Sequence, residues 1–276
     1  MTAAHEYFPS AGDRELLRLN NLETFAKLWQ AELQWFEEPN FRRSGWSGVA
    51  RHELRRADGT TVGIFVKRQA NHQRRTFKSP GGCPTFRSEW QNLKKLSRYQ
   101  IPVPQLLYYG ECRENGESRA ILITYELQGY LSLDALLKGG LSEERNRDLR
   151  AQIIVRVAEV VRRFHDHRFR HNCLYPKHLM LKIDSSGALA TNGICFIDLE
   201  KSRQVLYPQG ARIRDLDTLM RRCPEWTDYE KDLFFNYYLK LGLEQLQPAP
   251  LARALERWAL VKRVKRRIKG KIKPES

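Results

Sequence analysis

Two neighbouring segments of this 276-residue chain carry side chains suited to proton transfer or metal binding. The first, RHNCLYPKHLML, contains His171, Cys173 and His178, and the second, ICFIDLEKSR, places Asp198 after three apolar residues. An imidazole titrates near neutral pH and can accept a proton, whereas a thiol with an ordinary pKa of about 8.5 stays mostly neutral and binds Mg²⁺ poorly. Alternatively, His171 and His178 are structural residues that only form hydrogen bonds, and Asp198 only marks the end of a strand.

The first half of the chain has the pattern of strands around one helix. Residues 45–69 and 105–127 each form two strand-like runs around a turn, Ala57-Asp58-Gly59-Thr60 in the first and Glu114-Asn115-Gly116 in the second. The strand TVGIFVK ends on Lys67. Segment 81–104 begins with Gly and Pro and then becomes helical, with apolar residues at helical spacing: Phe86, Trp90, Leu93 and Leu96.

The second half is richer in helical pattern. Residues 141–169 predict a long helix with one apolar face and Ser142 as its N-cap. The strand pair HLMLKI and GICFIDL and a helical remainder from about residue 213 follow. A strand-rich first lobe joined by QGYLSLD to a helix-rich second lobe predicts an α+β, bilobal fold.

Taken in order, these features resemble the lipopolysaccharide kinase (Kdo/WaaP) superfamily, most closely its InaA-like branch, from about Gly45 to about Leu219. The resemblance implies a protein-kinase-like fold with a β-rich N-lobe and a helical C-lobe. The expected division is an N-terminal extension at 1–40, the N-lobe at 41–128, the C-lobe at 129–256 and a basic amphipathic tail at 257–276.

The resemblance also implies a nucleotide site. Lys67 matches the strand lysine that contacts nucleotide phosphates, and Glu89 matches the helix acid that orients it. The segment SGWSG, with Gly45 and Gly48, occupies the place of the glycine-rich loop, although a plain hairpin turn explains it almost as well. Asp198 matches the aspartate that holds Mg²⁺ against the phosphates of ATP, and a carboxylate supplies the hard oxygen ligand that Mg²⁺ prefers. Alternatively, Lys67 is a surface lysine and Glu89 an ordinary helix residue, neither with a role in nucleotide binding.

The loop that should accept the proton of the substrate departs from the family. His171 matches its opening histidine, His178 matches the later residue that helps to bind metal, and Asp215 matches a helix aspartate that supports the loop. Cys173, however, stands where the catalytic aspartate belongs. Because phosphoryl transfer depends mainly on positioning and charge neutralisation, and a general base contributes about 10²- to 10⁴-fold, the substitution is compatible with slow turnover. Either histidine is a substitute base, or both are structural.

Two functions are therefore expected from the resemblance. The first is a kinase that uses ATP and Mg²⁺ to phosphorylate a heptose or Kdo hydroxyl of the lipopolysaccharide inner core, or, as a variant, a protein. The second is a pseudokinase that binds nucleotide and acts as a regulatory or scaffold protein at the membrane. Retention of Lys67, Glu89 and Asp198 favours the kinase, and Cys173 favours the pseudokinase.

Charge suggests where the protein acts. Lys and Arg number 48 against 32 Asp and Glu, a formal net charge of +16, which implies an acidic partner. Residues 257–273 hold nine Lys or Arg and no acid, with apolar residues every three or four positions. Such a helix fits an anionic membrane surface, a solvated helix packed on its own lobe, or RNA, although no RNA-binding module accompanies it and nucleic acid is disfavoured. A second basic cluster, 67–78, either engages phosphates or is a solvated loop.

Localisation is expected to be cytoplasmic and peripheral to the inner membrane. The N-terminus lacks the pattern of a secretory signal, and no apolar run approaches the roughly 20 residues that span a bilayer. The five cysteines have neither zinc-site spacing nor an even count, which fits a reducing compartment.

Overall fold

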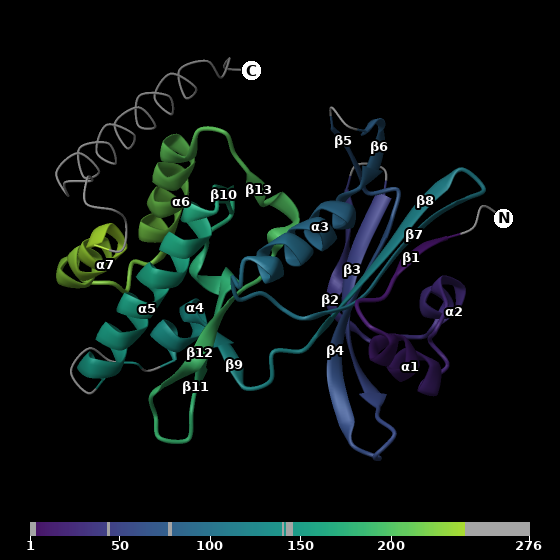
Figure 1. The fold of residues 1–276 in the computed structure, drawn as a ribbon, viewed down its shortest axis with the longest axis horizontal. Helices are drawn as coiled ribbons and strands as arrows, with labels where there is room; N and C mark the ends of the chain where they lie inside the picture. The colour runs from purple at the N-terminus through teal and green to yellow at the C-terminus, as the bar shows by residue number, and fades with distance from the viewer. Residues whose placement is uncertain (1–3, 43–44, 77–78, 140, 142–145, 241–276) are drawn as a thin grey trace, which may run out of the picture. The chain divides into compact units, whose positions relative to one another are not determined.

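A computed structural model describes residues 4–42, 45–76, 79–139, 141 and 146–240. The chain divides into two compact units (Figure 1). Of the described residues, those up to residue 129 together with 197–201 form the N-terminal unit, and those from 130 to 196 together with 202–240 form the C-terminal unit. Strands dominate the first and helices the second, so the predicted α+β class is confirmed.

An antiparallel sheet forms the centre of the N-terminal unit. Its strand order is β1-β7-β8-β4-β3-β2, and every neighbouring pair is antiparallel. Two of its hairpins close at the predicted turns, where Gly59, Asn115 and Gly116 adopt positive φ angles that glycine and asparagine tolerate. The strands are β1 (His5–Tyr7), β2 (Trp35–Arg42), β3 (Gly45–Arg55), β4 (Thr61–Ala70), β7 (Leu106–Glu114) and β8 (Glu117–Tyr125).

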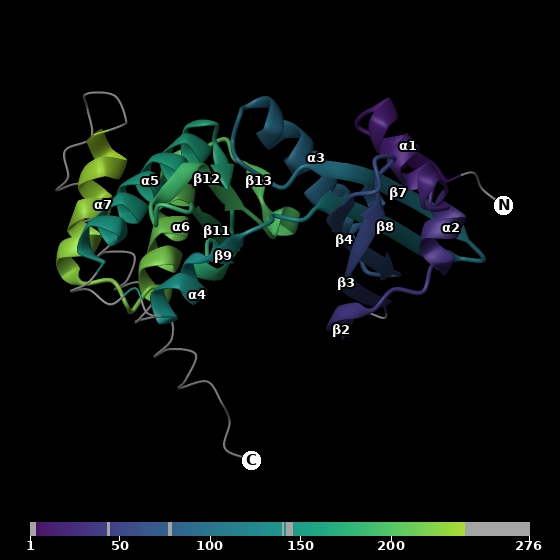
Figure 2. The same ribbon diagram turned by 90° about the horizontal axis from the view of Figure 1, so that it is seen from below.

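Helices cover both faces of this sheet. On one face, α1 (Ala11–Leu19) and α2 (Phe25–Gln30) pack into the apolar core (Figure 2). On the other face lies α3 (Thr85–Arg98), preceded by the small hairpin β5 (Gln73–Thr76) and β6 (Ser79–Pro84). Adjacent residues of β7 illustrate the division. The ring of Tyr108 packs against Phe8, and the ring of Tyr109 stacks on Trp90 of α3 with centroids 4.5 Å apart.

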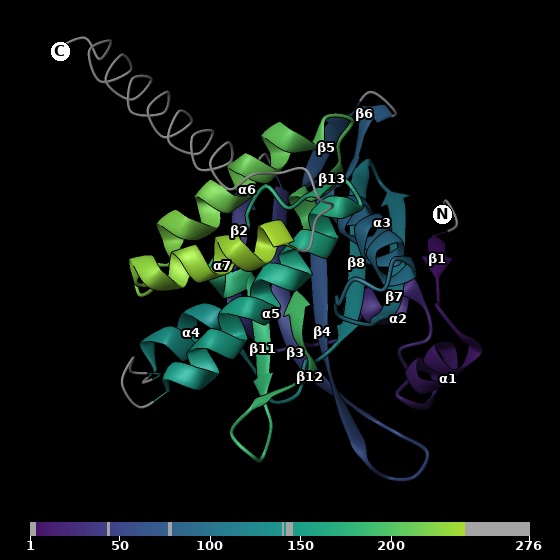
Figure 3. The ribbon, with the colours of Figure 1, turned by 60° about the vertical axis from the view of Figure 1, so that its left-hand side comes forward.

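The C-terminal unit is built around the long helix α5 (Arg147–Asp166), whose buried face includes Ile153, Val157 and Phe164. The helix confirms the prediction for this region, while its expected N-cap, Ser142, lies outside the described residues. Helix α7 (Asp228–Lys240) runs beside α5 (Figures 1 and 3). The other elements are α4 (Leu133–Lys138), α6 (Pro208–Arg222), the sheet β12-β11-β9 (Leu189–Phe196, Leu179–Ile183 and Tyr130–Ser132) and the pair β10 (Phe169–Arg170) and β13 (Arg203–Gln204).

The described part of the chain also contains two short 3₁₀ helices. η1 (Pro176–His178) belongs to the C-terminal unit, and η2 (Leu199–Lys201) belongs to the N-terminal unit. Within the part of the chain that the structure describes, no helix combines the length and apolar character needed to cross a bilayer.

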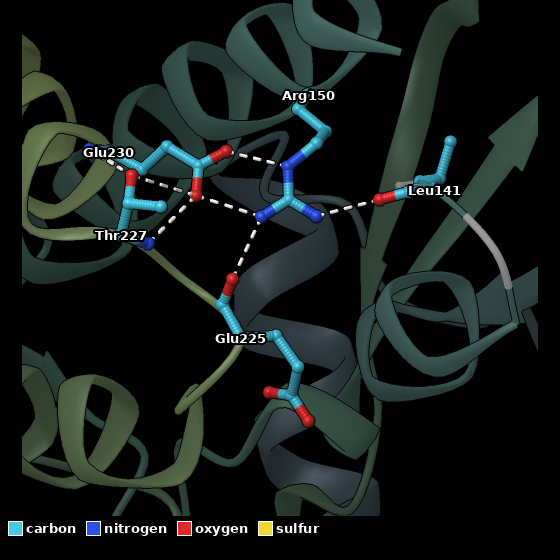
Figure 4. A network of polar contacts seen from close by, with 5 residues as sticks. All are labelled: Leu141, Arg150, Glu225, Thr227 and Glu230. Atoms are coloured by element: carbon cyan, nitrogen blue, oxygen red, sulfur yellow. Dashed lines mark hydrogen bonds and ion pairs between the residues drawn. The ribbon is translucent and has the colours of Figure 1, made fainter. Parts of the chain in front are cut away.

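A buried ion pair joins α5 to α7 (Figure 4). The guanidinium of Arg150 donates two hydrogen bonds to the Glu230 carboxylate, at 2.6 and 2.8 Å, and further bonds to the carbonyl oxygens of Leu141 and Glu225. Glu230 also accepts from the backbone N–H of Thr227, whose hydroxyl in turn accepts from the backbone N–H of Glu230. Thr227 and Glu230 thus form a reciprocal capping box at the start of α7.

Replacement of Glu230 by glutamine should destabilise the protein in a pH-dependent way. Burial alone raises the pKa of Glu230, but the hydrogen bonds and charge of Arg150 outweigh it and hold the pKa below its ordinary value. The stabilisation is therefore present above about pH 4.5 and is lost as the pH falls through the folded-state pKa. We expect Glu230→Gln to lower the free energy of unfolding by about 3 kcal/mol at pH 7, measured by urea denaturation.

The difference from wild type should shrink below about pH 4.5. Asp228→Asn is the matched control, because Asp228 lies on the same helix with its side chain fully exposed. A loss that is the same at pH 7 and pH 3.5, or as large in the control, would contradict this account.

Candidate nucleotide site and catalytic loop

The Lys67–Glu89 pair is the first feature of the candidate site. Lys67 lies on β4, which pairs with β3 on one side and β8 on the other, so its backbone is fixed in the middle of the sheet. Its ammonium donates to the Glu89 carboxylate of α3 at 2.6 Å. The Glu89 side chain is 6% exposed and that of Lys67 is 23% exposed. The pair is therefore largely shielded from water yet accessible on the lysine side.

A second residue of β4 fixes the helix that carries Glu89. Gln69 is fully buried, and its side-chain oxygen accepts from the Thr85 hydroxyl at 2.9 Å and from the backbone N–H of Phe86 at 3.1 Å. These are the first two residues of α3, which has no N-cap side chain of its own. Since Gln69 and Lys67 are two positions apart on one strand, they lie on the same face of the sheet. One strand therefore supplies both the lysine and the support for its partner.

Asp198 lies in the same unit, on the segment 197–201. This segment is anchored to α3, because the Asn92 side chain, one turn beyond Glu89, donates to the carbonyl oxygen of Leu199 at 2.9 Å. Asp198 itself has φ 57°, in the left-handed region that few residues other than glycine, asparagine and aspartate adopt.

The charges of this segment act on Lys67. Burial alone lowers the pKa of the Lys67 ammonium, but the negative charges of Glu89, Asp198 and Glu200 outweigh it and leave the pKa above its usual value. Lys67 is therefore a cation at neutral pH. For Glu200, burial and the nearby charges of Glu89 and Asp198 raise the pKa. Glu200 has no role among those expected from the sequence, although its position two residues after Asp198 was a signal.

The Glu89 carboxylate retains unused hydrogen-bonding capacity. One oxygen accepts from Lys67, and the other is buried without a hydrogen-bond partner among the described residues. Unsatisfied buried oxygens are uncommon and need an explanation such as a missing ligand or water. A hydrated cation or a ligand donor in this region would satisfy the oxygen, so the residues present fit a nucleotide with its metal ion.

The two glycines predicted to contact nucleotide have steric roles in the hairpin of β2 and β3. A Cβ at Gly45 would overlap the backbone from Ala70 to His72, and one at Gly48 would come within 2.7 Å of the Trp35 ring. Both positions are thus closed to side chains by protein neighbours. Their contact with nucleotide stays a prediction, and Ser44, which precedes them, lies outside the described residues.

The basic cluster at 67–78 is less exposed than its composition suggests. Arg68 is 6% exposed and donates to the carbonyl oxygen of Ala31, and burial lowers its pKa to about 10. The buried side chain and its hydrogen bond therefore contribute to the packing of the N-terminal unit, although burial disfavours the charge itself. Residues 77–78 lie outside the described residues.

The loop of His171, Cys173 and His178 belongs to the C-terminal unit and is held by Asp215 of α6. The Asp215 carboxylate accepts from the backbone N–H of His171 at 2.6 Å and from that of Asn172 at 3.0 Å. His165 lies 3.4 Å from the same carboxylate. Asn172 adopts φ 67°, so the chain turns sharply where the carboxylate holds it. Burial raises the pKa of Asp215, but the hydrogen bond and charge of His165 and the amide of His171 outweigh it and leave the pKa below its ordinary value.

Both histidines of the loop are buried. His171 is fully buried among aromatic rings, including those of Phe164, Phe196 and His178. His178 is 7% exposed, and its Nδ1 bonds to the carbonyl oxygen of Cys173 at 2.8 Å. A metal could therefore be bound by this ring only through Nε2. His171 has the surroundings of a structural residue, and Cys173, also 7% exposed, brings no carboxylate to the loop.

The two predicted metal ligands lie in different units. Asp198 belongs to the N-terminal unit and His178 to the C-terminal unit. Among the residues with described positions, no cluster of three or more histidine, cysteine, aspartate or glutamate side chains has the geometry of a metal site. A metal shared by Asp198 and His178 stays a prediction.

Substitution of Asp215 tests its hold on the loop. Asp215→Asn presents an amide N–H to backbone donors, so we expect the free energy of unfolding to fall by about 1–3 kcal/mol at pH 7. Hydrogen exchange of the His171 and Asn172 amides should be faster than in wild type. Asp184→Asn, an exposed aspartate in a β-turn of the same unit, is the control and should leave both amides unchanged. Unchanged protection in Asp215→Asn would contradict the assigned role.

Comparison with known proteins gives a consistent result. The model of the "Lipopolysaccharide kinase (Kdo/WaaP) family" matches residues 26–238. The protein InaA of Escherichia coli (strain K12) is 28% identical over 218 residues, which covers 78% of this chain and 96% of InaA. The solved structure of WaaP in complex with acyl carrier protein superposes with a TM-score of 0.66 at 21% identity, over 92% of this chain and 98% of WaaP. That likeness shows the kinase-like fold. Because the family model spans most of the sequence, the chain belongs to the lipopolysaccharide kinase (Kdo/WaaP) family.

Proposed function

We propose that the protein transfers the γ-phosphoryl group of ATP to a hydroxyl of a lipopolysaccharide core sugar, a heptose or Kdo. The observation that carries the proposal is the shielded Lys67–Glu89 pair with the charge of Asp198 beside it. A lysine oriented by a helix glutamate is how kinase-like folds hold the α- and β-phosphates. Membership of a kinase family supports the same chemistry.

Each residue has a defined task in this proposal. Lys67 uses one N–H to bind Glu89 and directs its remaining donors and its charge at phosphate oxygens. Asp198 and the His178 ring would hold Mg²⁺, which supplies charge neutralisation on the phosphates when bound. Gly45 and Gly48 would lie near the nucleotide. Asp215 holds the backbone of the segment from His171 to His178, which we call the acceptor loop.

The acceptor loop works without a carboxylate base. Cys173 occupies the position, and the burial of His171 removes that ring from the reacting atoms. Catalysis would then rest on positioning and electrostatics, with the acceptor proton leaving to solvent or to phosphate. Turnover about 10²- to 10⁴-fold below that of an aspartate-bearing relative is the expected consequence.

Labelled phosphate transfer from ATP·Mg²⁺ to lipopolysaccharide core extract tests the proposal. We expect wild type to transfer label and Asp198→Asn to lose about 10²- to 10³-fold in rate, as when one preorganised charge is removed. Asparagine is chosen because it tolerates the left-handed backbone of Asp198. Cys173→Ala should stay within about threefold of wild type, since the thiol has no assigned chemical step.

Cys173 also supports a second candidate, a nucleotide-binding pseudokinase with a regulatory or scaffold role. It predicts that ATP raises the Tm of wild type while no acceptor is labelled. Transfer that is equally fast in wild type and Asp198→Asn would contradict both candidates.

We further propose that residues 257–273, which lie outside the described residues, hold the protein at the anionic cytoplasmic face of the inner membrane. Each basic residue near such a surface contributes about 1 kcal/mol. Replacing the nine Lys and Arg of this segment by Gln should abolish cosedimentation with vesicles containing phosphatidylglycerol, at unchanged Tm. Vesicle binding that survives this change would contradict a membrane role of the tail. Binding of RNA, but not of vesicles, by wild type and loss of that binding in the variant would favour nucleic acid.

A further inference from the structure

A cavity of about 560 Å³ lies in the C-terminal unit beside the acceptor loop. Tyr175 and Lys177 of the loop itself form one wall. Side chains of α4 and of the end of α6 form the others, with Lys138 from α4 and Arg221 and Arg222 from α6. The volume lies within the range of small-molecule sites, about 300–1,000 Å³. Neither the nucleotide residues nor Asp215 line this cavity, so the roles assigned above do not account for it.

Positive charge is in excess around the cavity. Four cationic side chains line it, against two acidic ones, Asp134 and Glu225. Two of the cations are engaged, because Lys138 pairs with Asp134 at 3.0 Å and Arg221 pairs with Asp217 at 3.1 Å. Each pair lies within one helix, at i,i+4 spacing, and leaves little net charge at its position.

The other two cations have no carboxylate partner within the described part of the chain. Lys177 is exposed in η1 and makes no ion pair there. The Arg222 guanidinium lies over the Tyr175 ring, with its central carbon 5.4 Å from the ring centroid, a contact that leaves its N–H donors available to a ligand. A guanidinium fork and an ammonium that line one cavity offer donors and positive charge to a phosphate or carboxylate group.

The wall formed by Tyr175 and Lys177 is in contact with His178 of the same loop. The Tyr175 ring packs on His178 with centroids 5.3 Å apart, and Lys177 immediately precedes His178. A ligand bound by Lys177 and Arg222 is therefore held against the residues that are expected to receive the acceptor. The tyrosine hydroxyl adds a donor and an acceptor suited to sugar hydroxyls.

We infer that this cavity is a subsite for a sugar that carries an anionic group, phosphate or carboxylate, with Lys177 and Arg222 binding the anion. That the bound sugar is the phosphoryl acceptor rests on the proposed function; the binding does not. The subsite would select acidic core sugars over neutral ones, because two cations left unpaired favour a charged group over a hydroxyl.

Direct binding to the full-length protein tests the inference, with no ATP present. The probes are mannose 6-phosphate, glucuronate and inorganic phosphate, with mannose as the uncharged comparison, and Kd is measured by ligand-observed NMR and calorimetry. We expect at least one anionic sugar to bind tenfold or more tightly than mannose. Lys177→Glu/Arg222→Glu should weaken that binding at least tenfold. The control Lys182→Glu/Arg203→Glu makes the same charge change at two exposed positions that do not line the cavity, and should stay within twofold of wild type.

Inorganic phosphate binding as tightly as both sugars would mean an anion site without sugar selectivity and would overturn the subsite. Equal affinity in wild type and the double variant, or no saturable binding of any anionic probe to wild type, would overturn it as well. Lys177→Ala/Arg222→Ala gives the same comparison if the charge reversal does not fold. If no phosphate is transferred but binding of the anionic sugar depends on Lys177 and Arg222, the proposed function is refuted and the subsite is retained. If phosphate is transferred but binding does not depend on these two residues, the subsite is refuted and the proposed function is retained.

Discussion

The ion pair between Lys67 and Glu89 is the interaction on which the N-terminal unit is organised. Removing two charges from water is costly, and such a pair persists only where its geometry is fixed from both sides. Here the fixation comes from the sheet, which holds Lys67 on its central strand, and from Gln69, which holds the start of α3. A hydrogen bond from the Asn92 side chain connects the same helix to the segment that carries Asp198. A lysine, two acids and their supports are thus linked through one strand and one helix.

The acceptor loop follows a different principle. Its shape depends on the carboxylate of Asp215, which accepts two consecutive backbone N–H groups, and on a packed set of aromatic and imidazole rings. None of these contacts requires an aspartate at position 173. The scaffold of the loop is therefore compatible with the Cys173 substitution, and what the substitution removes is a chemical group. This separation explains how a chain can keep the architecture of a kinase family while departing from its catalytic sequence.

The C-terminal unit carries the subsite that we infer for an acidic sugar. Its long helix is tied to α7 by the buried Arg150–Glu230 pair, and the ends of α4 and α6 meet the loop around a cavity with excess positive charge. The basic residues behind the net charge of +16 therefore have different roles. Arg68 and Arg150 support packing, whereas Lys177 and Arg222 face the cavity.

The sequence by itself determined the family, the α+β class and most hairpins and helices, because strand alternation, helical periodicity and turn residues are local properties. Ordered landmarks such as Lys67, Glu89 and Asp198 could be recognised for the same reason. Tertiary structure decided the rest. The burial of His171, the support of α3 by Gln69, the charge of Glu200 near Lys67 and the steric closure at Gly45 all depend on residues distant in sequence. Burial and long-range hydrogen bonds arise from packing, which no local pattern encodes.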